Sequence, residues 1–185
     1  MTHHEIDVGS LLRRTVCDLY SNLVTRPTGA AVRKEIEVVL CGLDEPSLTV
    51  IDFSQVGLLD YSCADEVVGK LLDGVRRQVI VTDAYVLVRG VRDDHLEALD
   101  AVMQRYDLAV IAEGDDGAWR VVGPLDDEMR SVLDAVQSCG RIVKSDLAKA
   151  VDKPVSDVEA SLDGLLARRL VMRDDDAYVS LQSVM

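Results

Sequence analysis

The spacing of apolar residues in the first part of the chain predicts two helices followed by a strand. Residues 8–24 carry apolar side chains at three- and four-residue steps, with charged residues between them, which predicts an amphipathic helix. A second helix is expected over residues 30–40, after the turn at 26–29 and before Gly42. Residues 48–53 form a continuous run of β-favouring residues, which is typical of a strand buried on both faces of a parallel sheet.

The same alternation of helices and strands continues to residue 122. A loop is expected over residues 54–61, followed by a helix from 62 to 79; a strand over 79–81 is the alternative for the last turn of that helix. A strand over 85–88 and a helix over 92–106 come next. The last two strands, over 108–112 and 119–122, are expected to form a hairpin. Strands that alternate with helices imply right-handed crossovers and a mostly parallel sheet. The sequence therefore predicts an α/β fold.

The pattern changes at Gly123-Pro124, where we place a domain boundary. Three parts are expected: an N-terminal helix within residues 1–27, an α/β domain over 28–123, and a second domain over 124–185. The second domain is predicted to contain helices over 125–138, 145–151 and 157–170, then two short strands around the acidic residues 174–176.

Composition narrows the classes of function. The chain has 185 residues, 48% hydrophobic and 29% charged, which fits one globular domain or two small ones with no need for disulfides or metals. A formal charge of −13 repels nucleic-acid phosphates and anionic lipid, and 4% aromatic residues are too few for base-stacking platforms. The chain has neither an apolar run long enough to span a bilayer nor a signal-peptide pattern. We expect a soluble, cytoplasmic protein that does not contact membranes.

The sequence contains no motif that would support catalysis. Gly-rich phosphate loops, nucleophile elbows and metal-type spacings of Cys and His are absent, so we expect no catalytic residue, no metal and no cofactor. The four cysteines are interpreted as small buried hydrophobic residues in a reducing compartment. His3 and His4 lie at the N-terminus, and His95 is expected on a helix surface. The protein is therefore predicted not to be an enzyme.

The loop after the first predicted strand is the most informative segment. The strand ends at Asp52, whose carboxylate is expected to accept hydrogen bonds from loop amides, and Ser62 stands where the next helix begins. Ser62 and Asp65 resemble a capping box, although its strict form has Glu or Gln in the fourth place, so Ser62 is predicted to cap the helix. A phosphate added to this serine would find unsatisfied backbone N–H donors.

Residues 28–115 resemble the STAS domain, the fold of anti-sigma factor antagonists, in which an apolar strand, an Asp, a short loop and Asp-Ser-Ser-Gly precede a helix. Asp60 and Ser62 match the Asp and the phosphorylated Ser of that pattern, whereas Tyr61 replaces its first Ser and Cys63 its Gly. The run from Ser62 to Glu66 is closer to a variant branch of this family, which also has the Gly-x-x-Val-Arg helix start found at residues 29–33.

This resemblance implies regulation by contact with a protein partner, either an ATP-binding kinase or an anti-sigma-like protein. Ser62 is then the candidate phosphoacceptor. The residues expected to bind the partner are Asp60, Tyr61, Ser62, Cys63, Glu66 and Lys70.

Residues 124–185 resemble a bacterial winged helix-turn-helix domain, with a capping box at Ser156 and Glu159 predicted to start its third helix. The outward residues in the first half of that helix are acidic or small, the wing tip is three aspartates, and the domain has eight basic and twelve acidic residues. We therefore expect a protein-binding module, used for homodimerisation or docking. The alternative is a DNA-binding regulator whose backbone contacts would be Lys144, Lys149, Lys153, Arg168, Arg169 and Arg173.

Overall fold

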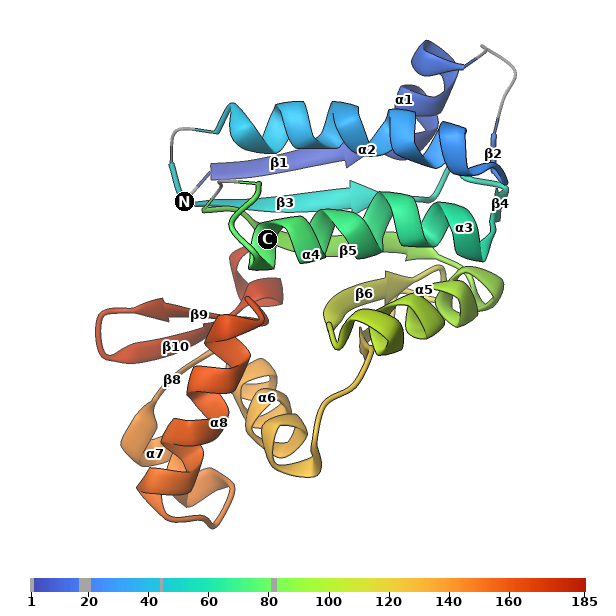
Figure 1. Cartoon of the computed structure of the whole chain (residues 1–185). Coiled ribbons are helices and arrows are strands. Elements are labelled where there is room, and N and C mark those ends of the chain that lie inside the picture. The colour runs from blue at the N-terminus through green and yellow to red at the C-terminus, as the bar shows by residue number, and fades with distance from the viewer. Residues whose placement is uncertain (1, 17–20, 44, 81–82) are drawn as a thin grey trace. The chain divides into compact units, whose positions relative to one another are not determined.

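The computed structural model describes residues 2–16, 21–43, 45–80 and 83–185 (Figure 1). The chain divides into two compact units, an N-terminal unit of residues 1–124 and a C-terminal unit of residues 125–185. The division follows Pro124, one residue after the boundary expected from the sequence. Within the described residues, no helix combines the length and the apolar character needed to cross a bilayer.

The N-terminal unit is built on a five-stranded sheet in the order β1-β3-β5-β6-β7. Its strands are β1 (Thr2–Asp7), β3 (Ser47–Asp52), β5 (Tyr85–Val91), β6 (Val110–Gly114) and β7 (Trp119–Val122). The first four are parallel, and β7 pairs antiparallel with β6 through a short turn. The predicted α/β class and the mostly parallel sheet are confirmed.

The parallel strands follow one another across the sheet in chain order, and right-handed crossovers then place the connecting helices on one face. Figure 1 shows α2, α3 to α4 and α5 side by side over the sheet. The helices of this unit are α1 (Val8–Thr15), α2 (Arg26–Cys41), α3 (Tyr61–Ala64), a π-helical turn η1 (Asp65–Gly69), α4 (Lys70–Arg76) and α5 (Asp93–Tyr106). Their apolar sides form a core with the strands, in which Ile36, Leu71 and Leu99 pack in one cluster with Ile51 and Val88.

The N-terminal helix predicted over residues 8–24 is wrong in extent. Helix α1 ends at Thr15, residues 17–20 lie outside the described part, and Asn22–Leu23 form a short strand, β2, parallel to β4 (Leu58–Leu59). The strand β1 was not predicted. It is an edge strand whose only buried residue is Ile6, so its sequence lacks the apolar pattern by which a strand is recognised.

The helix predicted over residues 62–79 ends earlier, at Arg76, and Val79 is exposed. The alternative strand at 79–81 falls partly on residue 81, which is outside the described residues. The strand predicted over 48–53 is confirmed, with Ser47 to Ile51 all buried. The continuous apolar run thus identified this buried parallel strand correctly.

The C-terminal unit contains three helices and a three-stranded antiparallel sheet in the order β8-β10-β9. Its elements are α6 (Asp127–Cys139), β8 (Arg141–Val143), α7 (Lys144–Ala150), α8 (Val155–Ala167), β9 (Val171–Asp174), β10 (Ala177–Ser180) and a final 3-10 turn (Leu181–Val184). The sequence predicted only two of these strands, because β8 has three residues and none is buried.

The predicted capping box at Ser156 and Glu159 is not formed. Helix α8 begins at Val155, with Pro154 in the cap position, so Ser156 already lies inside the helix. The Ser156 hydroxyl donates to Asp157, and Glu159 pairs with Lys144. Pro154 itself lies just before the first helical residue, and the helix begins at Val155, before the serine.

We predict that Gly90→Ala destabilises the N-terminal unit far more than Gly117→Ala. Both glycines have a positive φ, which costs an L-residue about 1–2 kcal/mol. A Cβ at Gly117 meets nothing within 4 Å, whereas one at Gly90 would lie 2.6 Å from the Ser54 nitrogen. Overpacking adds about 1–3 kcal/mol for Gly90→Ala. Urea unfolding followed by the fluorescence of Trp119, the single tryptophan, measures both variants. Equal losses of stability would contradict the close approach of β5 to Ser54.

Candidate functional site

The candidate site lies where β3 passes into α3, at the carboxyl edge of the sheet. Asp52, the last residue of β3, accepts a hydrogen bond from the Ser54 backbone N–H at 2.7 Å, so this carboxylate does satisfy a loop amide as expected. The loop then pairs with β2 through β4, and the Asp60 N–H donates to the Leu23 carbonyl at 2.9 Å. These bonds hold the loop in one path into the helix.

The residue that caps α3 is Asp60 and not Ser62. One carboxylate oxygen of Asp60 accepts from the Cys63 N–H at 2.8 Å and from the Ser62 hydroxyl at 2.9 Å. Asp60 has extended backbone angles, as a cap residue does, whereas Ser62 is the second residue of the helix. The capping-box prediction is wrong by two residues, although a polar helix start at this position is correct.

The six residues predicted to bind a partner divide into exposed and buried groups. Tyr61 is 40% exposed, and Asp60, Ser62 and Lys70 are half-buried. Cys63 and Glu66 are buried and offer no surface to a partner, which corrects their assignment. Leu58, which was not predicted, is 50% exposed and stands beside this group. We call Leu58, Tyr61 and Ser62 the helix-start surface.

Cys63 is buried for a local reason. Its thiol donates to the carbonyl of Thr25 at 3.1 Å, which joins the start of α3 to the start of α2. Burial, together with the charge of Asp60, raises the pKa of this thiol to about 12. The thiol is therefore protonated at neutral pH, and Cys63 acts as a packing residue.

Two adjacent carboxylates are buried in the turn that directly follows α3. Asp65 is 1% exposed and Glu66 is 3% exposed, both in the π-helical turn η1. One guanidinium nitrogen of Arg26 lies 2.7 Å from an oxygen of each carboxylate. Buried charges are costly unless they are paired and hydrogen-bonded, so this arginine is central to the arrangement.

Further donors complete what we call the carboxylate network. Asp65 also accepts from the Tyr106 hydroxyl at 2.9 Å and from Arg105 at 3.2 Å. Glu66 pairs with Lys70, and a nitrogen of Arg33 lies 3.6 Å from its second oxygen. The network therefore joins α2, η1 and α5, and it fixes the base on which the helix-start surface stands.

The network determines the charge state of both acids. Burial by itself would raise the pKa of Asp65, but hydrogen bonds from Arg26 and Tyr106 and the charge of Arg105 outweigh it, and the pKa is lowered. At Glu66, burial would again raise the pKa, but the hydrogen bonds from Lys70 and Arg26 outweigh this effect, and the pKa is lowered. Both carboxylates are ionised at neutral pH.

His95 lies in the first turn of α5 and is fully buried, so its predicted place on a helix surface is wrong. Its Nδ1 accepts from the Arg92 N–H at 3.5 Å. Burial lowers the pKa of the imidazole, which is therefore neutral at pH 7. In the described part of the chain, no group of three or more His, Cys, Asp and Glu side chains is arranged to hold a metal ion.

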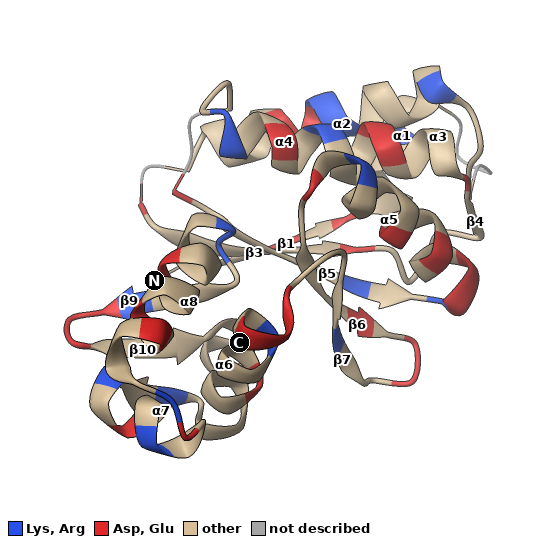
Figure 2. Cartoon of the chain, turned by 60° about the horizontal axis from the view of Figure 1, so that its bottom comes forward, with Lys and Arg blue, Asp and Glu red and all other residues tan. Residues whose placement is uncertain are grey.

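Five of the six basic residues proposed as alternative DNA contacts are engaged by other residues of the C-terminal unit. Lys144 lies 2.7 Å from Glu159, Lys149 lies 2.8 Å from Asp146, and Lys153 lies 2.8 Å from Glu128. Arg173 donates to the Asp175 carbonyl, and Arg168 donates to the Gly164 carbonyl. Arg169 also has an interaction partner. Figure 2 shows basic and acidic residues interspersed over this unit.

No family model matches the sequence, and no curated protein matches it. The function is therefore argued from the residues of the site. The described geometry offers an exposed apolar and hydroxyl-bearing surface on a rigid base. Such an arrangement is suited to binding another protein.

We predict that Asp60→Ala destabilises the N-terminal unit by about 1 kcal/mol, the usual cost of losing a helix cap. Ser62→Ala should cost less, because the bond from the Cys63 N–H to Asp60 is kept. Asp60→Asn is the matched control, since an amide oxygen also caps a helix. Urea unfolding followed by Trp119 fluorescence compares the three variants. A larger loss for Ser62→Ala than for Asp60→Ala would restore Ser62 as the cap.

We predict that Tyr106→Phe lowers the stability of the N-terminal unit by about 1.5–3 kcal/mol at neutral pH, because a hydrogen bond to a buried carboxylate is lost. Tyr178→Phe, in the C-terminal unit, is the control, because no hydrogen bond of its hydroxyl to a carboxylate is found among the described residues.

The same variant should change the response to acid. A lowered pKa means that the Asp65 carboxylate stabilises the fold above its ordinary pKa of 3.8, and that this stabilisation is lost as the pH falls through the lowered pKa. Removing the Tyr106 hydroxyl raises that pKa, so acid unfolding should begin at a higher pH than in the wild type. An unchanged acid transition would show that Tyr106 does not contribute to the charge state of Asp65.

Proposed function

We propose that this protein is a non-catalytic bacterial regulator that binds a protein partner through the helix-start surface. The observation that carries the proposal is the exposure of two apolar side chains, Leu58 and Tyr61, which flank the Asp60 cap in the sequence, while the Ser62 hydroxyl bonds to that cap. Large exposed apolar side chains around a polar centre are typical of protein-binding patches. The carboxylate network that follows α3 supplies a rigid base, which reduces the entropy lost on binding.

The resemblance to STAS domains supports a partner of the ATP-binding kinase or anti-sigma-like class, and it supports Ser62 as the residue that receives a phosphate. The Ser62 hydroxyl donates a hydrogen bond to the Asp60 carboxylate at 2.9 Å. A phosphorylated oxygen cannot donate, and its charge of about −2 would face the Asp60 carboxylate. Phosphorylation would therefore weaken the α3 cap and alter the surface offered to the partner.

For the C-terminal unit, we propose a winged helix used for protein binding or homodimerisation. The order helix, strand, two helices and a two-stranded wing supports this assignment. The alternative, a DNA-binding regulator, requires basic residues free to meet phosphates, but Lys144, Lys149 and Lys153 each pair with an acidic side chain of this unit. Sequence-specific, salt-sensitive binding to DNA would identify the alternative. A regulator of this kind acts in the cytoplasm.

The proposal is tested by isolating the partner from cells of the source organism with the full chain as bait. We predict that the wild type recovers an ATP-binding protein, and that Ser62→Glu and Tyr61→Ala each reduce its recovery by about tenfold or more, a change of roughly 1.4 kcal/mol. Mass spectrometry identifies the partner and any phosphate on Ser62. Ser131→Glu, an exposed serine on α6, is the matched control and should not change recovery. Equal recovery by all variants would refute the helix-start surface as the binding site.

A further inference from the structure

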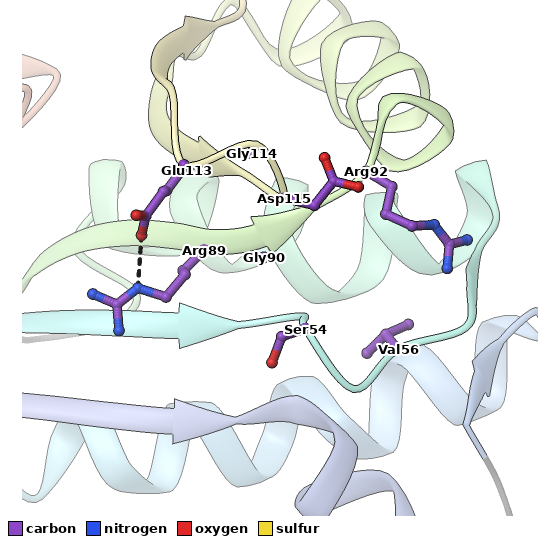
Figure 3. Close-up of a pocket in the computed structure, with 9 residues that line it drawn as sticks. Ser54, Val56, Arg89, Gly90, Arg92, Glu113, Gly114 and Asp115 are labelled. Atoms are coloured by element: carbon purple, nitrogen blue, oxygen red, sulfur yellow. Dashed lines mark hydrogen bonds and ion pairs between the residues drawn. The ribbon is translucent and has the colours of Figure 1, made fainter.

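A cavity of about 400 Å³ opens at the carboxyl ends of three parallel strands (Figure 3). Its wall consists of residues that follow or end these strands: Ser54 and Val56 after β3, Arg89 and Arg92 around the end of β5, and Glu113 and Asp115 around the end of β6. The volume is at the small end of the range for ligand sites in proteins. The cavity is separate from the helix-start surface.

The cavity is shaped by the backbone at the end of β5. The pairing of β5 with β6 shifts register between Val88 and Val91, and Gly90 within this bulge has a φ of +67°. The absence of a side chain at Gly90 lets β5 approach Ser54 closely. The Phe53 N–H donates to the Arg89 carbonyl at 2.9 Å, which fixes the ends of β3 and β5 together. The wall is therefore rigid and preformed.

The charged side chains of the wall balance one another, with two arginines and two acids. Arg89 donates to Glu113 at 2.8 Å and to Glu5 at 3.4 Å, so it is already paired. Figure 3 shows the Arg89–Glu113 pair on one side of the cavity, with Arg92 and Asp115 on the other. The two carboxylates would repel a polyanion such as a nucleotide, whereas a ligand with one charge of each sign can place its positive charge against a carboxylate and its negative charge against an arginine.

Arg92 and Asp115 keep unused hydrogen-bonding capacity. Arg92 uses Nε and one terminal nitrogen on Asp94, at 3.1 and 2.8 Å, and that same terminal nitrogen also donates to the Gly57 carbonyl. Its other terminal nitrogen, Nη1, has no acceptor among the described residues. The carboxylate of Asp115 likewise forms no hydrogen bond or ion pair with any side chain that the structure describes. The Arg92 guanidinium and the Asp115 carboxylate thus line the same cavity without forming a hydrogen bond to each other.

We propose that this cavity binds a small zwitterion of the α-amino acid class. The ligand's carboxylate accepts from Nη1 of Arg92, and its ammonium group donates to Asp115. Both are charge-assisted hydrogen bonds, which are stronger than neutral ones. Because Nη1 is the nitrogen that Asp94 does not use, the ligand binds without breaking the Arg92–Asp94 pair.

The test titrates the full chain, without any partner, with each of the twenty common L-amino acids by isothermal calorimetry. We expect at least one to bind saturably, with a dissociation constant in the millimolar range or below. The N-acetyl derivative of that amino acid lacks the ammonium group, and its amide lacks the carboxylate. Each should bind at least about tenfold more weakly. Inorganic phosphate and ATP are tested in parallel.

Arg92→Gln and Asp115→Asn should each weaken binding of that amino acid by about tenfold or more, whereas Asp93→Asn, an exposed neighbour, should leave it unchanged. Asp115 is exposed and has no side-chain partner among the described residues, so Asp115→Asn tests the site even if Arg92→Gln disturbs α5. Binding of no amino acid overturns the proposal, as does binding of phosphate or ATP in place of one, or equal affinity of Asp115→Asn and the wild type. These outcomes do not depend on the protein partner, and the partner experiment does not depend on them.

Discussion

The N-terminal unit depends on the pairing of two buried carboxylates, Asp65 and Glu66, with one guanidinium, that of Arg26. One oxygen of each carboxylate lies 2.7 Å from the same arginine nitrogen. Without that arginine, adjacent negative charges would stand almost completely out of water, where an unpaired charge is costly and like charges repel. With it, the start of α2 is tied to the turn that follows α3. The π-helical turn is what brings both consecutive acids to the inner side of this helix, and such turns occur frequently at functional positions.

The order of the strands explains why the candidate sites lie at one edge of the sheet. Since β1, β3, β5 and β6 follow one another in chain order, the crossover helices lie on one face, and the loops that leave the strands all emerge at the carboxyl edge. The helix-start surface follows β3, and the cavity lies between the ends of β3, β5 and β6. Loops held by a rigid sheet are where proteins most often place binding residues.

The sequence predicted what depends on local pattern and missed what depends on distant contacts. The apolar run of β3 and the spacing in α5 identified these elements, and the sequence placed the polar helix start near Ser62. Arg26 and Tyr106 could not be assigned to the site, because they lie 39 and 41 residues from Asp65 along the chain. The strand β1 was missed because an edge strand can consist almost entirely of polar residues. Asp60 and Ser62 are both suitable cap residues, and only the backbone angles distinguish them.

The loop between β3 and α3 connects the two candidate sites physically. It begins at Ser54 in the cavity wall and ends at Asp60, which caps the helix that presents Ser62. Between them, the Gly57 carbonyl accepts a hydrogen bond from Arg92, the arginine that also faces the cavity. With the proposed ligand bound, Arg92 would hold both the ligand and the Gly57 carbonyl, so a shift of its guanidinium would also act on the loop. Coupling between two sites requires an element that both share, and here that element is the loop from Ser54 to Asp60. The loop is at most seven residues long, and hydrogen bonds from the backbone N–H groups of Ser54 and Asp60 anchor its two ends.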